Sequence, residues 1–471
     1  MSKTAALYPS WQEKSWTAVK ILYTGLTGFC LLSYLWLLVI GAGIDNMSPV
    51  IWIARLVSVP LALYLGRLWK DKGFWILSLY TFLFLLRCFI PDPNSIFYEE
   101  VAENILSALW LFGACYGLGR ILDNRQLKAF FRVCAIIWTF GIVICSCISI
   151  YAAWRGQIIN TLGKGFFGLE ELAGRIRLFF VYLPTTAGSI IGISILICTL
   201  LAVSIKNRKV RLLFFISLIP LFLVLGLTDS RTAYISVPAG FGVMAFSAVL
   251  HHYQTESSKK EQKHNTKAYI IGSFTMIAVF FLLVILVLQI TPLFNHIKTR
   301  GMIPVAYAEE AKKTIVVSSS GFSGDRVLTG RAELWSSVIE HIKRNPIILL
   351  TGESKYAPLR GFDQFFAHCH SLYLQVLLES GIPGLLLFLS FIIYTIVHAI
   401  KVIRTPSLPL WVRLLPALPI SLWVGDIAET FTWLRSSQCP MGAIAIISAG
   451  IICAQKTKLC GDIKQTNEPI I

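Results

Sequence analysis

The feature that most constrains the fold of this chain is a series of long apolar runs that recur along nearly its whole length. A helix that crosses the hydrocarbon core of a bilayer needs about 20 mostly apolar residues. By that rule we count about twelve candidate spans. They lie near residues 18–43, 49–66, 73–90, 101–120, 129–153, 178–205, 211–227, 232–250, 268–290, 382–402, 410–427 and 437–455.

The composition excludes an ordinary soluble protein, because 55% of the 471 residues are hydrophobic and only 14% are charged. The strands of a membrane barrel alternate polar and apolar residues, whereas a segment such as "AVFFLLVILVLQI" does not. The first run is longer than the apolar part of a signal peptide and lacks an obvious cleavage site, so we expect a retained anchor. The sequence predicts an all-α, polytopic membrane protein.

The distribution of basic residues predicts the orientation in the membrane. Loops that are short and rich in Lys and Arg stay on the cytoplasmic side. If the N-terminus is inside, most basic residues fall in cytoplasmic segments, and the short outer loops around Asp45 and "PDPNSIFYEE" are acidic or bare. We therefore expect both termini in the cytoplasm. The net charge of +17 follows from this topology, and no nucleic acid is needed to explain it.

The long polar segment 291–370 divides the chain into three parts. We expect nine spans in residues 1–290, a large loop on the outer, periplasmic side in 291–370, and three spans with a cytoplasmic tail in 371–471. The loop is far longer than a connection between neighbouring helices needs. It contains "RAELWSSVIEHIKR", whose apolar residues recur at helical spacing until Asn345-Pro346, which predicts an amphipathic helix. A second short helix is predicted over 371–380, before "GIPG".

Three chain-distant polar residues are expected at the outer ends of these elements: Arg231, Arg331 and His370. Ionisable groups at membrane depth are costly and usually functional. Guanidinium groups match phosphate oxygens, and a histidine can take a proton from a hydroxyl. Such a group suits glycosyl transfer from a polyprenyl diphosphate. The residues alone also allow a snorkelling Arg231, an ordinary first-turn Arg331 and an exposed loop His370.

The stretch "TGRAELWSSVIEHIKRNPIILLTGES" with "HCHSLYLQVLLESGIPGLLLFLSFI" resembles the signature region of the O-antigen ligase and polymerase superfamily. "DSRTAYIS" resembles the Ser-Arg-Thr segment of the same superfamily, and the similar stretches span residues 228–385. The resemblance implies a GT-C-like glycosyltransferase of the bacterial inner membrane. It would move a glycan from undecaprenyl diphosphate to a periplasmic acceptor by an inverting, metal-independent reaction without a cofactor.

The resemblance also implies roles for particular residues. Arg231 and Arg331 would bind the diphosphate, His370 would serve the acceptor hydroxyl, and Arg175 and Arg177 match basic residues that help to bind the donor. The sequence departs from the family pattern in "LTGESKYAPLR" after the amphipathic helix and in the flanks of Arg175. Ser371 also stands where Asn is commoner. Membrane lipids are further expected partners.

Several functions remain open at this level. The acceptor is either lipid A-core, for a ligase, or a growing glycan, for a polymerase, and the lack of an additional C-terminal domain favours the ligase. A lipid-linked glycan flippase would carry midspan charges in broken helices and two related halves, but the main midspan charges are Arg55 and Arg87. A metal-dependent oligosaccharyltransferase would want an acidic pair in the first outer loop, which offers only Asp45. A structural or sensory role is the remaining alternative.

The eleven cysteines do not predict a disulfide scaffold, because most of them lie in apolar runs, where they behave as small hydrophobes. Only Cys369 and Cys439 are expected near the outer face, where an oxidising compartment allows pairing. Their pairing is left open. No Cys or His spacing is typical of a zinc site.

Overall fold

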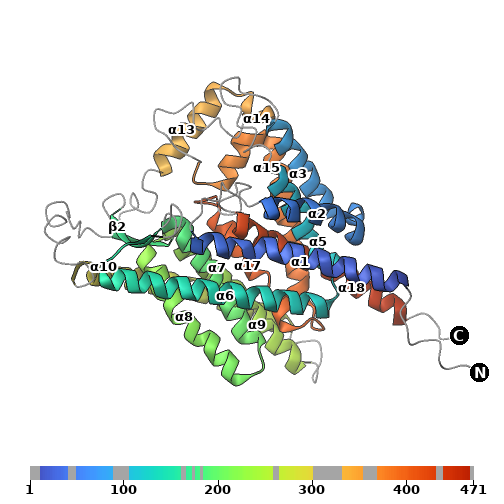
Figure 1. The fold of residues 1–471 in the computed structure, drawn as a ribbon, viewed down its shortest axis with the longest axis horizontal. Coiled ribbons are helices and arrows are strands. Elements are labelled where there is room, and N and C mark those ends of the chain that lie inside the picture. Colours follow the sequence, from blue (N-terminus) through green and yellow to red (C-terminus); the bar gives the residue numbers. More distant parts are fainter. Residues whose placement is uncertain are drawn as a thin grey trace, which may run out of the picture.

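The computed structural model describes residues 11–40, 49–88, 105–160, 166–171, 176–180, 184–257, 265–300, 331–353, 369–430 and 439–466 (Figure 1). Most of these residues are helical. The helices are α1 (Trp11–Ile40), α2 (Pro49–Gly66), α3 (Lys72–Cys88), α5 (Tyr116–Ile121), α6 (Asn124–Arg155), α7 (Pro184–Ser204), α8 (Arg208–Thr228), α9 (Arg231–Ser257), α10 (Asn265–Arg300), α13 (Arg331–Arg344), α14 (Ile348–Thr351), α15 (Leu372–Arg404), α16 (Leu410–Leu414), α17 (Ala417–Gly425) and α18 (Cys439–Thr466).

Eight helices in the described part of the chain are long and apolar enough to cross a membrane. Four shorter apolar segments accompany them: Lys72–Leu86, Ile105–Ile121, Leu410–Gly425 and Pro440–Gln455. These elements confirm the prediction of a largely helical multi-pass membrane protein. The count of twelve spans and the periplasmic loop stay predictions.

Several helices depart from the regular cylinders that the apolar runs suggest. The predicted short helix over 371–380 is continuous with the following span in α15, with a kink at Gly381 (φ 64°, ψ −169°). A Cβ there would lie 2.8 Å from the Leu349 carbonyl oxygen, so only glycine fits both the backbone angle and the close packing of α14. The span predicted over 410–427 is split into α16 and α17, with Pro416 before the second. Residues Trp110–Cys115 (η2) form a π-helix.

A three-stranded antiparallel sheet lies between α6 and α7, in the connection between the spans predicted over 129–153 and 178–205. Its strands are β1 (Ile159–Asn160), β2 (Phe166–Glu171) and β3 (Ile176–Phe180), in the order β1-β2-β3. Phe167 pairs with Phe180 across β2 and β3, and both side chains are buried. The segment thus adds a small sheet to a chain that is otherwise helical in its described part. The strands are too short for the alternation of residues to have stood out.

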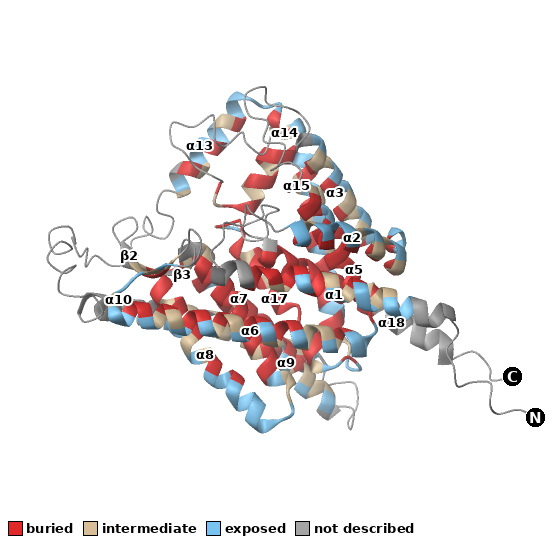
Figure 2. Cartoon of the chain, in the orientation of Figure 1, coloured by how far each residue is buried: buried red, intermediate tan, exposed pale blue. Residues whose placement is uncertain are grey.

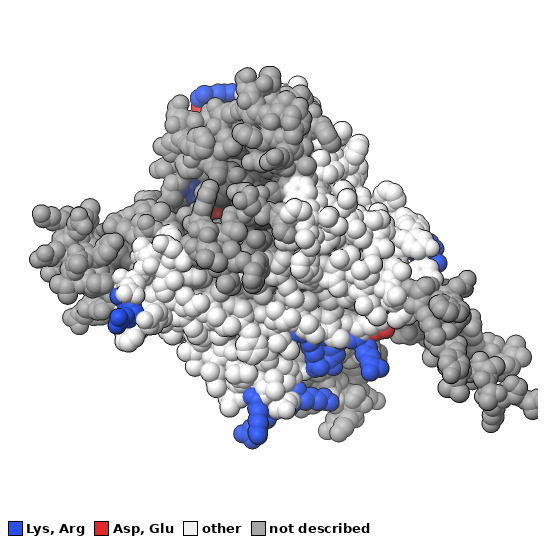
Figure 3. Space-filling model, viewed as in Figure 1, with Lys and Arg blue, Asp and Glu red and all other residues white. Residues whose placement is uncertain are grey.

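The core of the molecule is centred on α7, which packs between α6, α8 and α9. Of the most apolar 18 residues of α7, 83% are buried. The corresponding share for α10, which lies at the periphery, is 6%. Figure 2 shows buried residues concentrated around α7 and α17 and exposed residues along the outer faces of α6 and α8. On the face drawn in Figure 3, basic side chains gather mostly along the lower and right-hand edges.

Arg55, one of the two midspan arginines, is buried within the packed helices of the N-terminal half. Its Nη1 donates to Ser107 Oγ at 2.9 Å, and its Nη2 donates to the Tyr34 hydroxyl. The guanidinium carbon lies 4.8 Å from the ring centroid of Trp110, a cation–π distance. Arg55 thus holds α1, α2 and η2 together. Arg87 lies in α3, and its side chain is outside the described part of the structure.

Candidate active site

The site begins with the turn that leads into α15. His370 has a φ of 48°, a left-handed conformation that is uncommon for a residue other than glycine. The turn is held on both sides: the Cys369 amide donates to Gln375 Oε1 at 3.0 Å, and the Leu372 amide donates to the carbonyls of Asp426 and Glu429, each at 2.9 Å. These bonds compensate for the strain of the turn and fix the backbone at His370.

Glu429 joins two of the predicted site residues. Its Oε1 accepts a hydrogen bond from Arg331 Nη2 within an ion pair, and its Oε2 lies 3.1 Å from His370 Nδ1. The Glu429 side chain is 4% exposed, whereas that of His370 is 33% exposed. A buried carboxylate must be paired to be stable, and here an arginine 98 residues away in sequence supplies the charge. The side chain of the histidine on its other oxygen is partly exposed.

The amphipathic helix α13 brings Arg331 to this carboxylate. The structure confirms the helix predicted over "RAELWSSVIEHIKR". Leu334, Val338 and Ile342 form its buried face, and they pack in a small cluster with Ile348 of α14, Cys369 and Leu378 of α15. Trp335 Nε1 donates to the Cys369 carbonyl at 3.0 Å. The helix therefore packs on α14, α15 and the His370 turn, and this packing sets the position of Arg331.

Arg231 begins α9, two residues after Asp229, which adopts a left-handed conformation at the end of α8 (φ 51°). Two contacts give the direction of α9 against α16 and α17. Arg413 Nη1 lies 2.9 Å from His251 Nδ1, and Ser421 Oγ donates to the Ser236 carbonyl at 2.7 Å.

Residue numbers rise along α16 and α17 while they fall along α9, so these elements are antiparallel. The start of α9 consequently lies at the same end of the bundle as the loop that follows α17 and carries Glu429. The structure places Arg231, Arg331 and His370 at one end of the molecule, and it joins the last two through a shared carboxylate.

Arg177 lies on β3, where its register partner on β2 is Glu170, and its side chain is half-buried. The strand packs on α7 and α8. Because α7 begins directly after β3 and α8 runs back toward the sheet, the end of α8 near β3 is the one that leads into Arg231. Arg177 thus belongs to the same end of the bundle as Arg231. Arg175 lies outside the described residues.

Glu429 is the residue of this group that the sequence analysis missed. It follows the span over 410–427 in "GDIAET", where an acid looks like an ordinary residue of a short loop. The available signal was the pair Asp426 and Glu429 directly after an apolar run, since acids at that depth need partners. The partner itself is set by tertiary packing.

Cys369 is a buried free thiol in the structure.

The fold and this group of residues define a helical multi-pass membrane protein with an arginine, glutamate and histidine site at one end of its bundle. No curated protein matches the chain. The family model described as O-antigen ligase matches residues 216–389, which include Arg231, α13, the His370 turn and the kink of α15. Over these residues the chain is similar to O-antigen ligases, and the match supports the superfamily of O-antigen ligases and polymerases. The match supports an activity of the ligase or polymerase type in general.

Proposed function

We propose that the protein is an O-antigen ligase, which transfers a glycan from an undecaprenyl-diphosphate donor to a hydroxyl of lipid A-core. The observation that carries the proposal is the pairing of His370 and Arg331 on the carboxylate of Glu429. In this arrangement His370, as a base for the acceptor hydroxyl, contacts one carboxylate oxygen of Glu429. Arg331, as a cation for the leaving diphosphate, contacts the other. The family match supports the substrate class.

In this proposal His370 is the general base. A carboxylate only accepts hydrogen bonds, so the contact with Glu429 favours a ring proton on Nδ1, and we assign to Nε2 the role of accepting the proton of the acceptor hydroxyl. A carboxylate in this position also stabilises the imidazolium that forms. The acceptor oxygen attacks the anomeric carbon from the face opposite the diphosphate, and its proton passes to Nε2. The anomeric C–O bond breaks, and its electron pair leaves with undecaprenyl diphosphate. The configuration inverts.

The arginines stabilise the charge that develops on the leaving diphosphate. Arg331 donates through Nη2 to Glu429, but a guanidinium has five N–H donors, and the others suit phosphate oxygens. Arg231 is the second member of the clamp, and Arg177 and Arg175 bind the donor further from the reacting bond. Fixed cations can supply this stabilisation, so we propose that no metal ion or other cofactor takes part.

The orientation follows from the same proposal together with the charge distribution. We place the site on the periplasmic side of the inner membrane and both termini in the cytoplasm. Residues 1–290 and 371–471 then contribute the spans, and residues 291–370 form a periplasmic loop whose helices α13 and α14 pack beside the His370 turn. Residues 301–330 and 354–368 of this loop are outside the described part of the structure.

The test is a complementation experiment in the native host, with lipopolysaccharide resolved on gels. The variants are His370→Ala, Arg331→Ala and Arg231→Ala. The matched control is Arg344→Ala, because Arg344 lies on the same helix as Arg331 but is 73% exposed and pairs with Glu340 one turn away. Membrane levels of each variant are measured in parallel, so that loss of protein is not mistaken for loss of activity.

We expect the three site variants to lose all glycan beyond the core and to accumulate lipid-linked polymer, while the control keeps the normal ladder. Core that carries a single repeat would instead assign the protein as a polymerase. Normal ladders in all three site variants would refute the site. Loss of lipid-linked polymer from the outer leaflet, rather than its accumulation, would favour a flippase.

A further inference from the structure

A groove of about 510 Å³ lies between α1 and α6, far from the candidate active site. The α6 end that meets the sheet is its C-terminal end, at Arg155 and Gly156. The groove runs along the first half of α6, from Leu122 to Cys134. It therefore lies toward the end of the bundle opposite Arg231, the end that we propose to be cytoplasmic. Its volume is in the usual range for ligand-binding clefts.

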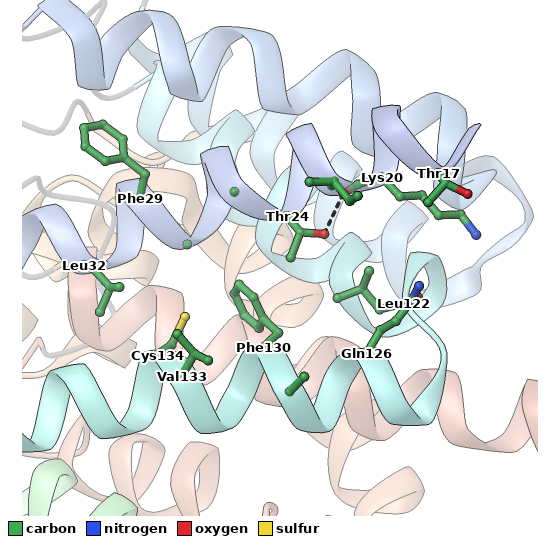
Figure 4. A pocket seen from close by; sticks show the side chains of 14 residues that line it. Thr17, Lys20, Thr24, Phe29, Leu32, Leu122, Gln126, Phe130, Val133 and Cys134 are labelled. Atoms are coloured by element: carbon green, nitrogen blue, oxygen red, sulfur yellow. Dashed lines mark hydrogen bonds between the residues drawn. The ribbon is translucent and has the colours of Figure 1, made fainter. Parts of the chain in front are cut away.

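The groove is polar at one end and apolar along the rest of its length (Figure 4). Thr17, Lys20 and Gln126 line the polar end, whereas Phe29, Leu32 and Val133 line the apolar part. Among the described residues that line the groove, Lys20 is the charged one, and none carries a carboxylate. This gradient matches a molecule with an anionic head and a hydrocarbon chain.

The groove opens away from the protein core. Three of its lining residues are strongly exposed, Ile21 at 67%, Val133 at 55% and Phe29 at 47%. All three lie in helices that are long and apolar enough to span a membrane, so their exposed faces contact lipid. Gly25 and Gly28 form part of the α1 wall, and a Cβ added at Gly25 would meet no atom within 4 Å. The space beside this glycine is open to a lipid chain.

The surroundings of the polar end favour a negative headgroup. The first turns of α6 carry Arg125 and Lys128 beside Gln126. The nearby acid, Asp123, caps α6 by accepting from the Gln126 amide at 2.8 Å. A basic residue near the membrane surface attracts anionic lipid, and a lysine stem can follow the apolar wall while its ammonium reaches the headgroup.

We propose that this groove binds an acyl chain of an anionic glycerophospholipid from the adjoining leaflet, with Lys20 at the lipid phosphate. The occupant is distinct from the polyprenyl donor, whose diphosphate belongs at the opposite end of the bundle. The inference does not depend on the proposed transfer reaction. The bound lipid fills the gap between α1 and α6 and links the N-terminal helix to the rest of the bundle.

The test is native mass spectrometry of the purified full chain, titrated with phosphatidylglycerol or phosphatidylcholine of the same acyl composition. The variants are Lys20→Ala, which removes the charge, and Gly25→Leu, which adds a side chain in the groove at a position where an added Cβ meets no atom within 4 Å. The matched control is Lys209→Ala, an exposed lysine at the start of α8. Undecaprenyl phosphate serves as a competitor. Thermal unfolding of each variant checks that the fold is retained.

We expect the wild-type protein to retain one phosphatidylglycerol more tightly than phosphatidylcholine. Lys20→Ala should weaken phosphatidylglycerol binding about fivefold and leave phosphatidylcholine unchanged, and Gly25→Leu should abolish the retained lipid of either kind. Equal losses in Lys20→Ala and Lys209→Ala would overturn the proposal, because they would indicate diffuse surface charge. Unchanged retention in Gly25→Leu, or displacement by equimolar undecaprenyl phosphate, would also overturn it.

Discussion

His370 Nδ1 lies 3.1 Å from Glu429 Oε2, although the two residues are 59 positions apart in the chain. The turn that presents His370 is bonded to the loop that presents Glu429, through the Leu372 amide and the Glu429 carbonyl. Backbone and side-chain contacts therefore fix the same pair. A base that is oriented in this way loses little entropy when the acceptor binds. The charge of Glu429 is the part of this arrangement that substitutions can test most directly.

Glu429→Gln keeps the size of the side chain but removes the negative charge that pairs with Arg331 and orients His370. Hydrogen bonds to charged groups contribute about 1.5–3 kcal/mol, so we expect kcat to fall about tenfold to a hundredfold. The measurement is glycan transfer by purified protein. Glu353→Gln is the control, since Glu353 pairs with His341 away from the site. Equal activity of Glu429→Gln and wild type would contradict the orienting role.

Trp335→Phe keeps an aromatic ring but removes the hydrogen bond to the Cys369 carbonyl. A neutral hydrogen bond is worth about 0.5–1.5 kcal/mol, so we expect transfer to fall about twofold to tenfold. Ser336→Ala on the exposed side of the same helix should have no effect. Steady-state transfer rates of the two variants give the comparison. A larger loss in Ser336→Ala than in Trp335→Phe would show that the bond does not position the turn.

Leu334→Ala tests whether α13 is held by its apolar face. Leu334 is 4% exposed in the cluster with Val338 and Ile348, and a buried Leu→Ala change costs about 2–5 kcal/mol. We expect faster hydrogen exchange in α13 and in the His370 turn. Ile339→Ala should leave exchange unchanged, because Ile339 is 45% exposed. Equal exchange in both variants would mean that α13 is not anchored through this cluster.

Burial, with a smaller contribution from Glu379, raises the pKa of the Cys369 thiol to about 12. The thiolate is the reactive form, and at pH 8 its fraction is then only about one in ten thousand. In a variant with Cys369 as its single cysteine, we expect iodoacetamide to react slowly with the native protein and rapidly after unfolding in detergent. Fast labelling of the native protein would show that the His370 turn opens readily.

The sequence allowed much of the fold to be predicted, because helix length and periodicity are local properties. The apolar run that became α7 is long enough to span a bilayer, and Leu334, Val338 and Ile342 recur at the spacing of one helix face. The break at Gly381 was predicted from "GIPG". Ile339 recurs at the same spacing, but it is exposed. Periodicity alone does not show how wide the buried stripe of a helix is.

The features that escaped prediction depend on contacts between distant segments. Strands β1 to β3 are short and gain their stability from pairing and from packing on α6, α7 and α8. Glu429 gains its importance only where Arg331 and His370 meet it. The catalytic and binding roles of Arg231, Arg331, His370, Arg175 and Arg177 were inferred from residue chemistry and family resemblance, and they remain proposals.

The most direct test of the central claim is transfer by purified protein from an undecaprenyl-diphosphate glycan to lipid A-core, with a chelator present. We predict product of inverted anomeric configuration from the wild type and from Arg344→Ala. His370→Ala should give less product by a factor of about a hundred or more, the usual contribution of a general base. Transfer by His370→Ala at the wild-type rate, or a strict requirement for a divalent metal ion, would contradict the account.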